Sequence, residues 1–266
     1  MTLPQVPFDD RGLAYGDGVF ETVLLRQGKP VLWPYHLARL TRGCRRLGIP
    51  VPGQQALDAA WQEKPQAPLE VLKLIVTRGS GGRGYALPDA PLPRLLIRRT
   101  PFVPAVKRWQ EGVTVRQCRL QLGHQPLLAG IKHLNRLENV LARREWHSSE
   151  IAEGLLGDTH DQLVEATSMN VFWQQQGHIY TPRLDKCGVA GTLRDALIEK
   201  GEVHEATLPM TALPTLERLW VANSVQGVWP VTALVDQANA RLKSWSLEAV
   251  DDFQLAAHRL LGYVAQ

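Results

Sequence analysis

The sequence contains little cysteine, and none of its three cysteines lies close to another. Cys44, Cys118 and Cys187 are an odd number at wide spacing. This pattern argues against a disulfide framework and against a metal site built from clustered thiolates. It is typical of a protein kept in a reducing compartment, so we expect a cytoplasmic protein.

Targeting and membrane signals are also missing. The first twelve letters, MTLPQVPFDDRG, are acidic and contain proline, where a secretory signal needs basic residues followed by an apolar run. No later stretch approaches the length of apolar sequence that crosses a bilayer. We expect neither export nor membrane insertion.

The chain lacks a strong charge of one sign. Its 30 Lys and Arg face 26 Asp and Glu, and the basic residues are spread along the chain. The balance argues against a nucleic-acid partner and suits a small anionic substrate or cofactor, although a plain basic surface explains it equally well. The eight histidines show no metal-binding spacing, so no metal is expected, and His36 and His133 are interpreted as structural or supporting groups.

Periodicity predicts strands and helices in both halves of the chain. The first half is expected to hold a hairpin over 19–32, a helix opened by Pro34, and strands over 69–77 and 94–99. The glycine-rich text RGSGGRGY, residues 78–85, is interpreted as a mobile loop between those strands. It lacks the complete pattern of a nucleotide-phosphate loop.

After the strand-like text VTVRQCRL, residues 113–120, the second half is predicted to contain an amphipathic helix over 132–146, short strands, and helices after Thr192 and from Phe253. Together the elements predict a two-domain α+β fold. Its parts are an N-terminal α/β domain (1–105), a connecting region (106–123) and a C-terminal domain that carries Lys132 (124–266).

Lys132 is the first candidate for chemistry. A lone lysine is ordinarily a solvated surface charge. Lys132, however, follows the apolar text LLAGI and opens the predicted helix. Burial there would disfavour the ammonium form and favour an amine that can form an imine.

Several ordered motifs carry a resemblance that covers nearly the whole chain. They are YGDGVFET, HLARL, RGSGGRGY, GIKHLNRLENVLAR, LVEATSMNVFW, GVAGTLRD and ANSVQGVWPV. The sequence resembles the fold-type IV pyridoxal-phosphate enzymes, with a fold like that of D-amino-acid aminotransferase. In detail it is similar to their aminodeoxychorismate lyase branch. Leu137 stands where branched-chain members carry a tyrosine, which argues against that branch.

The resemblance implies that pyridoxal 5'-phosphate is bound as a Schiff base to Lys132. It further implies that Arg39 binds the cofactor phosphate and that Glu165 contacts the pyridine nitrogen. A guanidinium suits phosphate, and a carboxylate keeps that nitrogen protonated. The ordinary alternative for Arg39 is one more arginine in a solvated stripe with Arg42 and Arg46. For Glu165 it is a polar strand residue.

Further roles follow from the same resemblance. Gly191 and Thr192 would offer amides at a helix start to the cofactor phosphate, and Ser224 a hydroxyl. A plain helix cap explains Thr192 as well. Thr22 would move a proton near the leaving group, although a β-branched strand residue is its ordinary interpretation.

The weakest predictions concern the substrate. Arg78 and Arg83, in the glycine-rich loop, are proposed to engage its carboxylates. Asn135, three residues after Lys132 on the predicted helix, would meet the substrate or make a local polar contact.

The resemblance therefore implies a 4-amino-4-deoxychorismate lyase of folate biosynthesis that forms 4-aminobenzoate and pyruvate from a small-molecule substrate. A D-amino-acid-type aminotransferase is the first alternative, and a cofactor-binding protein without turnover is the second. Membership also implies a homodimer.

Overall fold

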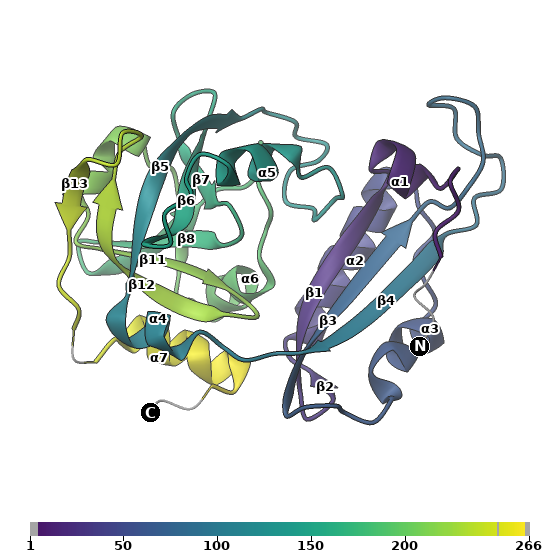
Figure 1. Ribbon diagram of the computed structural model, residues 1–266, viewed down its shortest axis with the longest axis horizontal. Coiled ribbons are helices and arrows are strands. Elements are labelled where there is room, and N and C mark those ends of the chain that lie inside the picture. Colours follow the sequence, from purple (N-terminus) through teal and green to yellow (C-terminus); the bar gives the residue numbers. More distant parts are fainter. Residues whose placement is uncertain (1–4, 249, 264–266) are drawn as a thin grey trace. The chain divides into compact units, whose positions relative to one another are not determined.

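The chain forms two compact units in the computed structural model, which describes residues 5–248 and 250–263. The first unit comprises Met1–Val103 with Ile131–Arg136, and the second comprises Pro104–Gly130 with Leu137–Gln266 (Figure 1). The outermost residues of the predicted domains, 1–4 and 264–266, lie outside the described residues.

The first unit is built on a four-stranded antiparallel sheet with the strand order β2-β1-β3-β4. Its elements are α1 (Arg11–Tyr15), β1 (Gly18–Arg26), β2 (Lys29–Pro30), α2 (Trp33–Leu47), α3 (Gln54–Gln62), β3 (Leu69–Thr77) and β4 (Arg94–Pro101). Side chains alternate along β1, so Val19, Val23 and Leu25 share one face and pack with Leu40 and Cys44 of α2. That face holds the core of the unit, and α2 covers it (Figure 1).

Helix α2 forms and ends as its sequence predicts. Pro34 lies in its first turn, where the backbone N–H that proline lacks would have no partner within the helix. Arg45 and Arg46 lie in its last turn, where their positive charges interact favourably with the negative end of the helix dipole. Gly48 ends the helix in a left-handed conformation, with φ of 65°, that glycine adopts without strain. The helix therefore holds its buried side chains at fixed places under the sheet.

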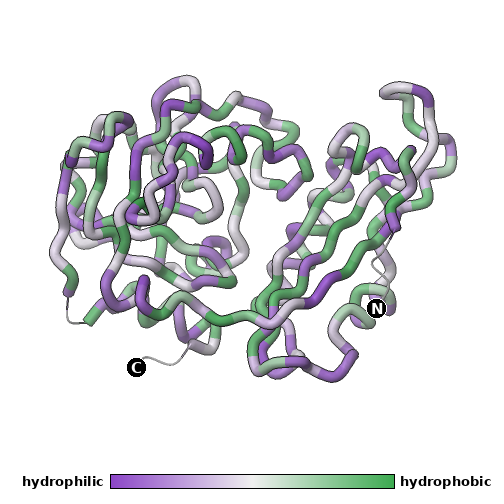
Figure 2. The backbone as a smooth tube through the Cα atoms, in the orientation of Figure 1, coloured by the Kyte–Doolittle hydropathy of each residue, from purple (hydrophilic) through white to green (hydrophobic). Residues whose placement is uncertain are grey.

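The second unit contains a mixed nine-stranded sheet with the order β10-β9-β8-β11-β12-β5-β6-β7, and β13 pairs with β12. Its strands are β5 (Val113–Leu122), β6 (Ile151–Asp158), β7 (Leu163–Ala166), β8 (Asn170–Gln175), β9 (His178–Pro182), β10 (His204–Ala206), β11 (Arg218–Asn223), β12 (Gly227–Val235) and β13 (Arg241–Ser244). Its helices are α4 (Val106–Glu111), α5 (Leu137–Arg143), α6 (Thr192–Glu199), the 3-10 helix η1 (Met210–Thr215) and α7 (Asp252–Leu261). Apolar stretches follow the strands of both units (Figure 2).

Two parts of the predicted domain division are wrong. Residues 106–123 are not a connection, because they form α4 and β5, and β5 pairs in parallel with β12 and β6 inside the sheet. Lys132 belongs to the first unit, because its segment pairs with β1. The first division of the chain, between Val103 and Pro104, lies close to the predicted one. Among the described residues, no helix combines the length and apolar character needed to cross a membrane.

The buried imidazole of His258 in α7 makes the stability of the second unit depend on pH. Its Nε2 accepts a hydrogen bond from the Val228 amide at 3.0 Å, so the ring is neutral in the fold. Burial lowers its pKa from 6.5 to about 4. Between these values the unfolded chain binds a proton that the folded chain does not, so stability falls as the pH drops through this window, by roughly 3 kcal/mol.

Urea unfolding at pH 7 and pH 4.5 measures this loss. His258→Leu should reduce the pH dependence by about this amount, whereas His204→Asn, at an exposed histidine, should preserve it. An unchanged slope in His258→Leu would contradict the assignment.

Candidate active site

Lys132 lies on an extended segment, not at the start of a helix. The Phe20 amide donates to the Lys132 carbonyl at 2.9 Å, and the Leu134 amide donates to the Gly18 carbonyl at 3.0 Å. Helix α5 begins only at Leu137. The predicted helix over 132–146 is therefore wrong for its first five and last three residues. Hydrogen bonds to β1 hold the chain at Lys132 extended.

The lysine side chain lies against an aromatic ring of β1. Its Nζ is 4.6 Å from the centroid of the Phe20 ring, close enough for a cation–π contact. Thr22 is two residues further along the strand and therefore shares this face. Both Phe20 and Thr22 are half-buried. The structure thus brings the predicted imine lysine and the predicted proton-moving threonine to the same face of one sheet.

The opposite face of β1 carries a buried ionic cluster of Glu21, His36 and Arg39. Glu21 accepts from Arg39 Nε at 2.8 Å and Nη2 at 2.5 Å, and its Oε2 lies 2.6 Å from His36 Nδ1. Burial alone would raise the Glu21 pKa, but the charge of Arg39 and the hydrogen bonds from Arg39 and His36 lower it to about 2. The cluster thus holds the Nε and Nη2 nitrogens of the Arg39 guanidinium in place.

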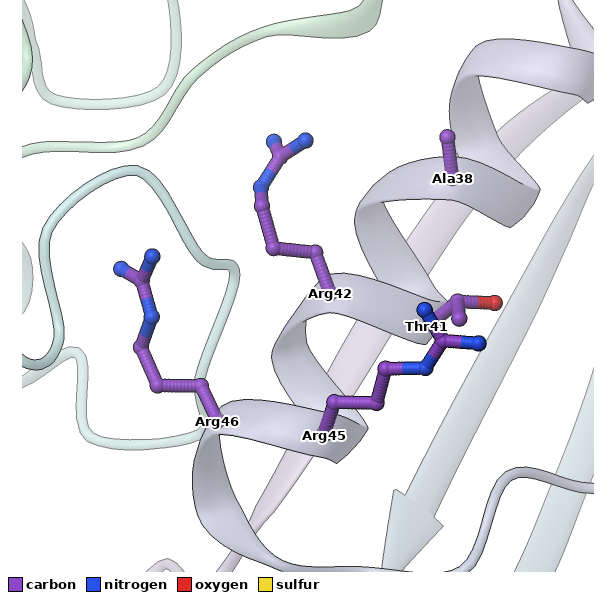
Figure 3. A pocket seen from close by; sticks show the side chains of 5 residues that line it. All are labelled: Ala38, Thr41, Arg42, Arg45 and Arg46. Carbon is purple, nitrogen blue, oxygen red and sulfur yellow. The ribbon is translucent and has the colours of Figure 1, made fainter.

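Arg39 is separated from the other arginines of α2. It is buried, whereas Arg42, Arg45 and Arg46 line an open depression along the helix with Ala38 and Thr41. The depression has a volume of about 600 Å³. Figure 3 shows Arg42 and Arg46 extending to one side of the helix and Arg45 running along it toward Thr41. The alternative that placed Arg39 in a solvated stripe is therefore wrong.

The glycine-rich loop is anchored by a residue that the sequence did not single out. Arg11 donates from Nη1 to the carbonyls of Gly84 at 3.0 Å and Ala86 at 3.1 Å, and its Nε donates to Asp17. These bonds fix the loop to α1 and argue against the prediction that the loop is mobile.

The two loop arginines differ in their surroundings. Arg78 is 3% exposed, and its guanidinium donates to both carboxylate oxygens of Asp17 and to the carbonyls of Leu47 and Gly48. This bonding gives Arg78 a structural place and argues against its predicted contact with substrate. Arg83 is exposed on the loop, and its substrate role stays a prediction.

Asn135 makes a local contact. Its Nδ2 donates to the Gly16 carbonyl at 3.2 Å, at the end of α1, and the residue is not helical. The helical reasoning behind its predicted substrate role is therefore wrong, and the structure favours the local polar contact.

In the second unit, two donors orient the carboxylate of Glu165 on β7. Asn139 Nδ2 donates to Oε1 at 3.1 Å, and the Val189 amide donates to Oε2 at 2.8 Å. Glu165 is 4% exposed. Asn139 lies on α5, 26 residues before its partner, and sequence spacing gave no signal for this contact.

Gly191 and Thr192 stand at the start of α6, as predicted. Gly191 is the N-cap, and no side chain caps the helix there. A Cβ on Gly191 would lie 1.8 Å from Oδ1 of Asn170, so the position has no room for a larger residue. Thr192 is buried, and the first amides of the helix have no acceptor within it. Such a helix start suits an anion.

Ser224 occupies the turn between β11 and β12 and is 8% exposed. Asn223 Oδ1 accepts from the amides of Val225 at 2.9 Å and Gln226 at 2.7 Å, which fixes the turn around the serine. The hydroxyl of Ser224 is thus held on a defined backbone.

Comparison with known proteins decides the family. The Amino-transferase class IV profile matches residues 18–234, most of the chain. The chain belongs to the class IV aminotransferases.

The alignments with individual relatives span most of this chain and most of each relative. Aminodeoxychorismate lyase of Vibrio harveyi is 35% identical over 87% of this chain and 89% of its own length. The crystal structure of 4-amino-4-deoxychorismate lyase from Pseudomonas aeruginosa is 40% identical, with a TM-score of 0.85 over 96% of this chain and 95% of that one. D-alanine aminotransferase of Listeria innocua is 28% identical over 85% of this chain and 81% of its own length.

Class IV aminotransferases use pyridoxal 5'-phosphate and share the mixed α/β fold of fold-type IV, and this chain is an enzyme of that type. Its donor groups fit the cofactor. The amine of Lys132 suits the cofactor's carbonyl group. The buried guanidinium of Arg39 suits its phosphate, and so do the amides at the start of α6. The oriented, buried carboxylate of Glu165 suits a protonated ring nitrogen.

Proposed function

We propose that this class IV aminotransferase-family enzyme is a 4-amino-4-deoxychorismate lyase, which converts its substrate to 4-aminobenzoate and pyruvate for folate synthesis. The observation that carries the proposal is the identity of 35% and 40% to two lyases over nearly the full length of each chain. The D-alanine aminotransferase is 28% identical. Thr22 lies on the same face of β1 as Phe20, whose ring contacts Lys132, and this position supports a role for Thr22 in the elimination reaction.

Pyridoxal phosphate, when bound, supplies a ring that accepts the electrons of a carbanion. Lys132 would hold it covalently through its amine, and this amine, once free, would remove the proton from the amine-bearing carbon of the substrate. Lys132 is half-buried, and its amine lies beside the Phe20 ring.

The remaining groups hold and orient. The guanidinium of Arg39 would bind the phosphate, and the amides at Gly191 and Thr192 and the hydroxyl of Ser224 are donors that also suit a phosphate. The carboxylate of Glu165 would accept a hydrogen bond from the ring N–H and so keep that nitrogen protonated. Asn139 acts through Glu165, because its amide fixes one carboxylate oxygen, and it is therefore a positioning residue.

Thr22 distinguishes the lyase from a transaminase in this proposal. Elimination breaks the C–O bond between the ring and the enolpyruvyl group, and the released enolpyruvate becomes pyruvate by taking up a proton on its methylene carbon. Amino transfer releases no such group. The Thr22 hydroxyl supplies that proton from the face shared with Phe20. 4-Aminobenzoate is then released, and Lys132 would again hold the cofactor.

Pyruvate release from 4-amino-4-deoxychorismate by the purified enzyme tests the proposal. Thr22→Val should lower this rate about 10²-fold, the size of a lost proton-transfer group, with unchanged cofactor absorbance. Thr100→Val is the matched control, because Thr100 is a half-buried threonine of β4 in the same sheet. A D-amino-acid-type aminotransferase would instead release no pyruvate and would exchange amino groups between amino-acid and keto-acid pairs.

We also propose that the enzyme is a homodimer. Helix α5 exposes apolar side chains at the spacing of one helix face, with Leu137 at 74%, Val140 at 53% and Leu141 at 50%. Such a stripe marks a surface for association. Sedimentation equilibrium of the purified protein measures the assembly directly, and a monomer at micromolar concentration would contradict it.

A further inference from the structure

His124, Asp158 and His160 form a cluster in the second unit that the proposed reaction does not use. One side-chain ligand atom from each lies within 4.8 Å of the others. Among the described residues, this is the one group of three or more metal-ligating side chains at such spacing. The sequence gave no sign of it, because His124 and His160 stand far apart in the chain.

The backbone around the cluster is well defined. Asp158 ends β6 and is paired in register with Leu122, the last residue of β5, so His124 follows two residues beyond that end. The β6–β7 turn that carries His160 is closed by a hydrogen bond from the Asp158 amide to the Gln162 carbonyl at 2.8 Å. The three side chains therefore start from two adjacent parallel strands and one tight turn.

The carboxylate of Asp158 is oriented before any ion arrives. Its Oδ1 accepts from the amides of His160 and Gln162, both at 2.9 Å. Its Oδ2 lies 2.7 Å from Nε2 of His124. One oxygen is thus held by the turn, and the other is directed at the imidazole.

The two imidazoles lie face to face. Their centroids are 4.7 Å apart and their planes are inclined by 20°. A tetrahedral zinc ion with bonds of about 2.0–2.1 Å requires donor atoms roughly 3.3 Å apart. His160 is exposed and His124 has a side chain 22% exposed, so small rotations bring the donors to that spacing without disturbing a core.

We propose that His124, Asp158 and His160 bind a divalent first-row transition-metal ion. Two imidazoles and one carboxylate are donors that zinc accepts, and three protein ligands leave a position for water. The bound ion would join the residues after β5 to the β6–β7 turn. The site is distinct from the residues assigned to the cofactor and does not depend on the lyase activity.

Calorimetric titration with zinc chloride tests the site. The protein carries no affinity tag, is purified with its cofactor, freed of metal with a chelator and held in a buffer that does not bind zinc. We expect saturable binding of one ion per chain. His124→Ala and His160→Ala should each raise the dissociation constant for zinc at least tenfold.

His204→Ala is the matched control and should stay within twofold of the wild type. His204 is also exposed in the second unit, and its ring centroid lies 6.1 Å from that of His178. The His204→Ala variant therefore measures how much zinc an ordinary pair of surface histidines binds. Circular dichroism and thermal unfolding without zinc verify that the variants fold. Cobalt(II) gives a second readout, because its visible spectrum reports entry into the protein site and should be lost in His160→Ala.

His160 decides between this site and a plain ion pair of His124 with Asp158. Unchanged zinc binding in His160→Ala, or no saturable binding in the wild type, would overturn the proposal. Zinc binding that persists in both histidine variants and alters the cofactor's visible absorbance would place the ion on the cofactor, and would overturn it as well.

Discussion

Lys132→Ala should remove both the visible absorbance of the cofactor imine and nearly all turnover. The covalent link and the proton transfer from carbon both depend on the same amine, and loss of a proton-transfer group alone costs about 10²–10⁴-fold in rate. The half-buried Lys132 side chain lies against the Phe20 ring. Absorbance of the reconstituted protein and release of pyruvate are the two measurements.

Lys73→Ala is a closely matched control. Lys73 Nζ lies 5.1 Å from the centroid of the same Phe20 ring, but this lysine is exposed on β3. The control should retain the imine absorbance. If Lys73→Ala loses it and Lys132→Ala keeps it, Lys132 is not the cofactor's lysine.

Glu21→Ala should lower the free energy of unfolding by about 3–5 kcal/mol, because it leaves the Arg39 guanidinium buried without its carboxylate. Glu21 is 1% exposed and holds two guanidinium nitrogens. Its pKa in the fold is about 2, against 4.5 unperturbed, so this stabilisation is present above pH 4.5 and is lost as the pH falls toward 2. Urea unfolding at pH 7 measures the change.

Two further variants isolate the role of the charge. Glu63→Ala, at an exposed acid of the same unit, should change stability by less than about 0.5 kcal/mol. Glu21→Gln keeps the shape of the side chain and should fold, but with weaker pyridoxal phosphate binding, because Arg39 is no longer held by a charge. Wild-type cofactor affinity in Glu21→Gln would show that the cluster does not position Arg39.

Local patterns in the sequence predicted most strands and helices. The strand predicted over 69–77 matches β3, and the helix opened by Pro34 matches α2, because alternation and capping are local properties. The segment after Lys132 failed for the opposite reason. Its leucine spacing predicted one helix from Lys132, yet hydrogen bonds to β1 hold the residues at Lys132 extended, and α5 begins only at Leu137.

The candidate site was predictable where a motif marks a residue and unpredictable where partners meet across the chain. Resemblance pointed to Lys132, Arg39 and Glu165. It gave no sign that Glu21 covers one edge of Arg39 or that Asn139 orients Glu165. These contacts join positions 18 and 26 residues apart, and only the fold brings them together.

The pairing of the lysine segment with β1 restricts how this region can evolve or be engineered. Because side chains alternate along a strand, an insertion or deletion of one residue between Gly18 and Phe20 would turn the opposite face toward Lys132. The lysine would then meet Val19 or Glu21 in place of Phe20. Specificity near the lysine can therefore change through point substitutions at Phe20 or Thr22, while the length of this stretch must stay constant.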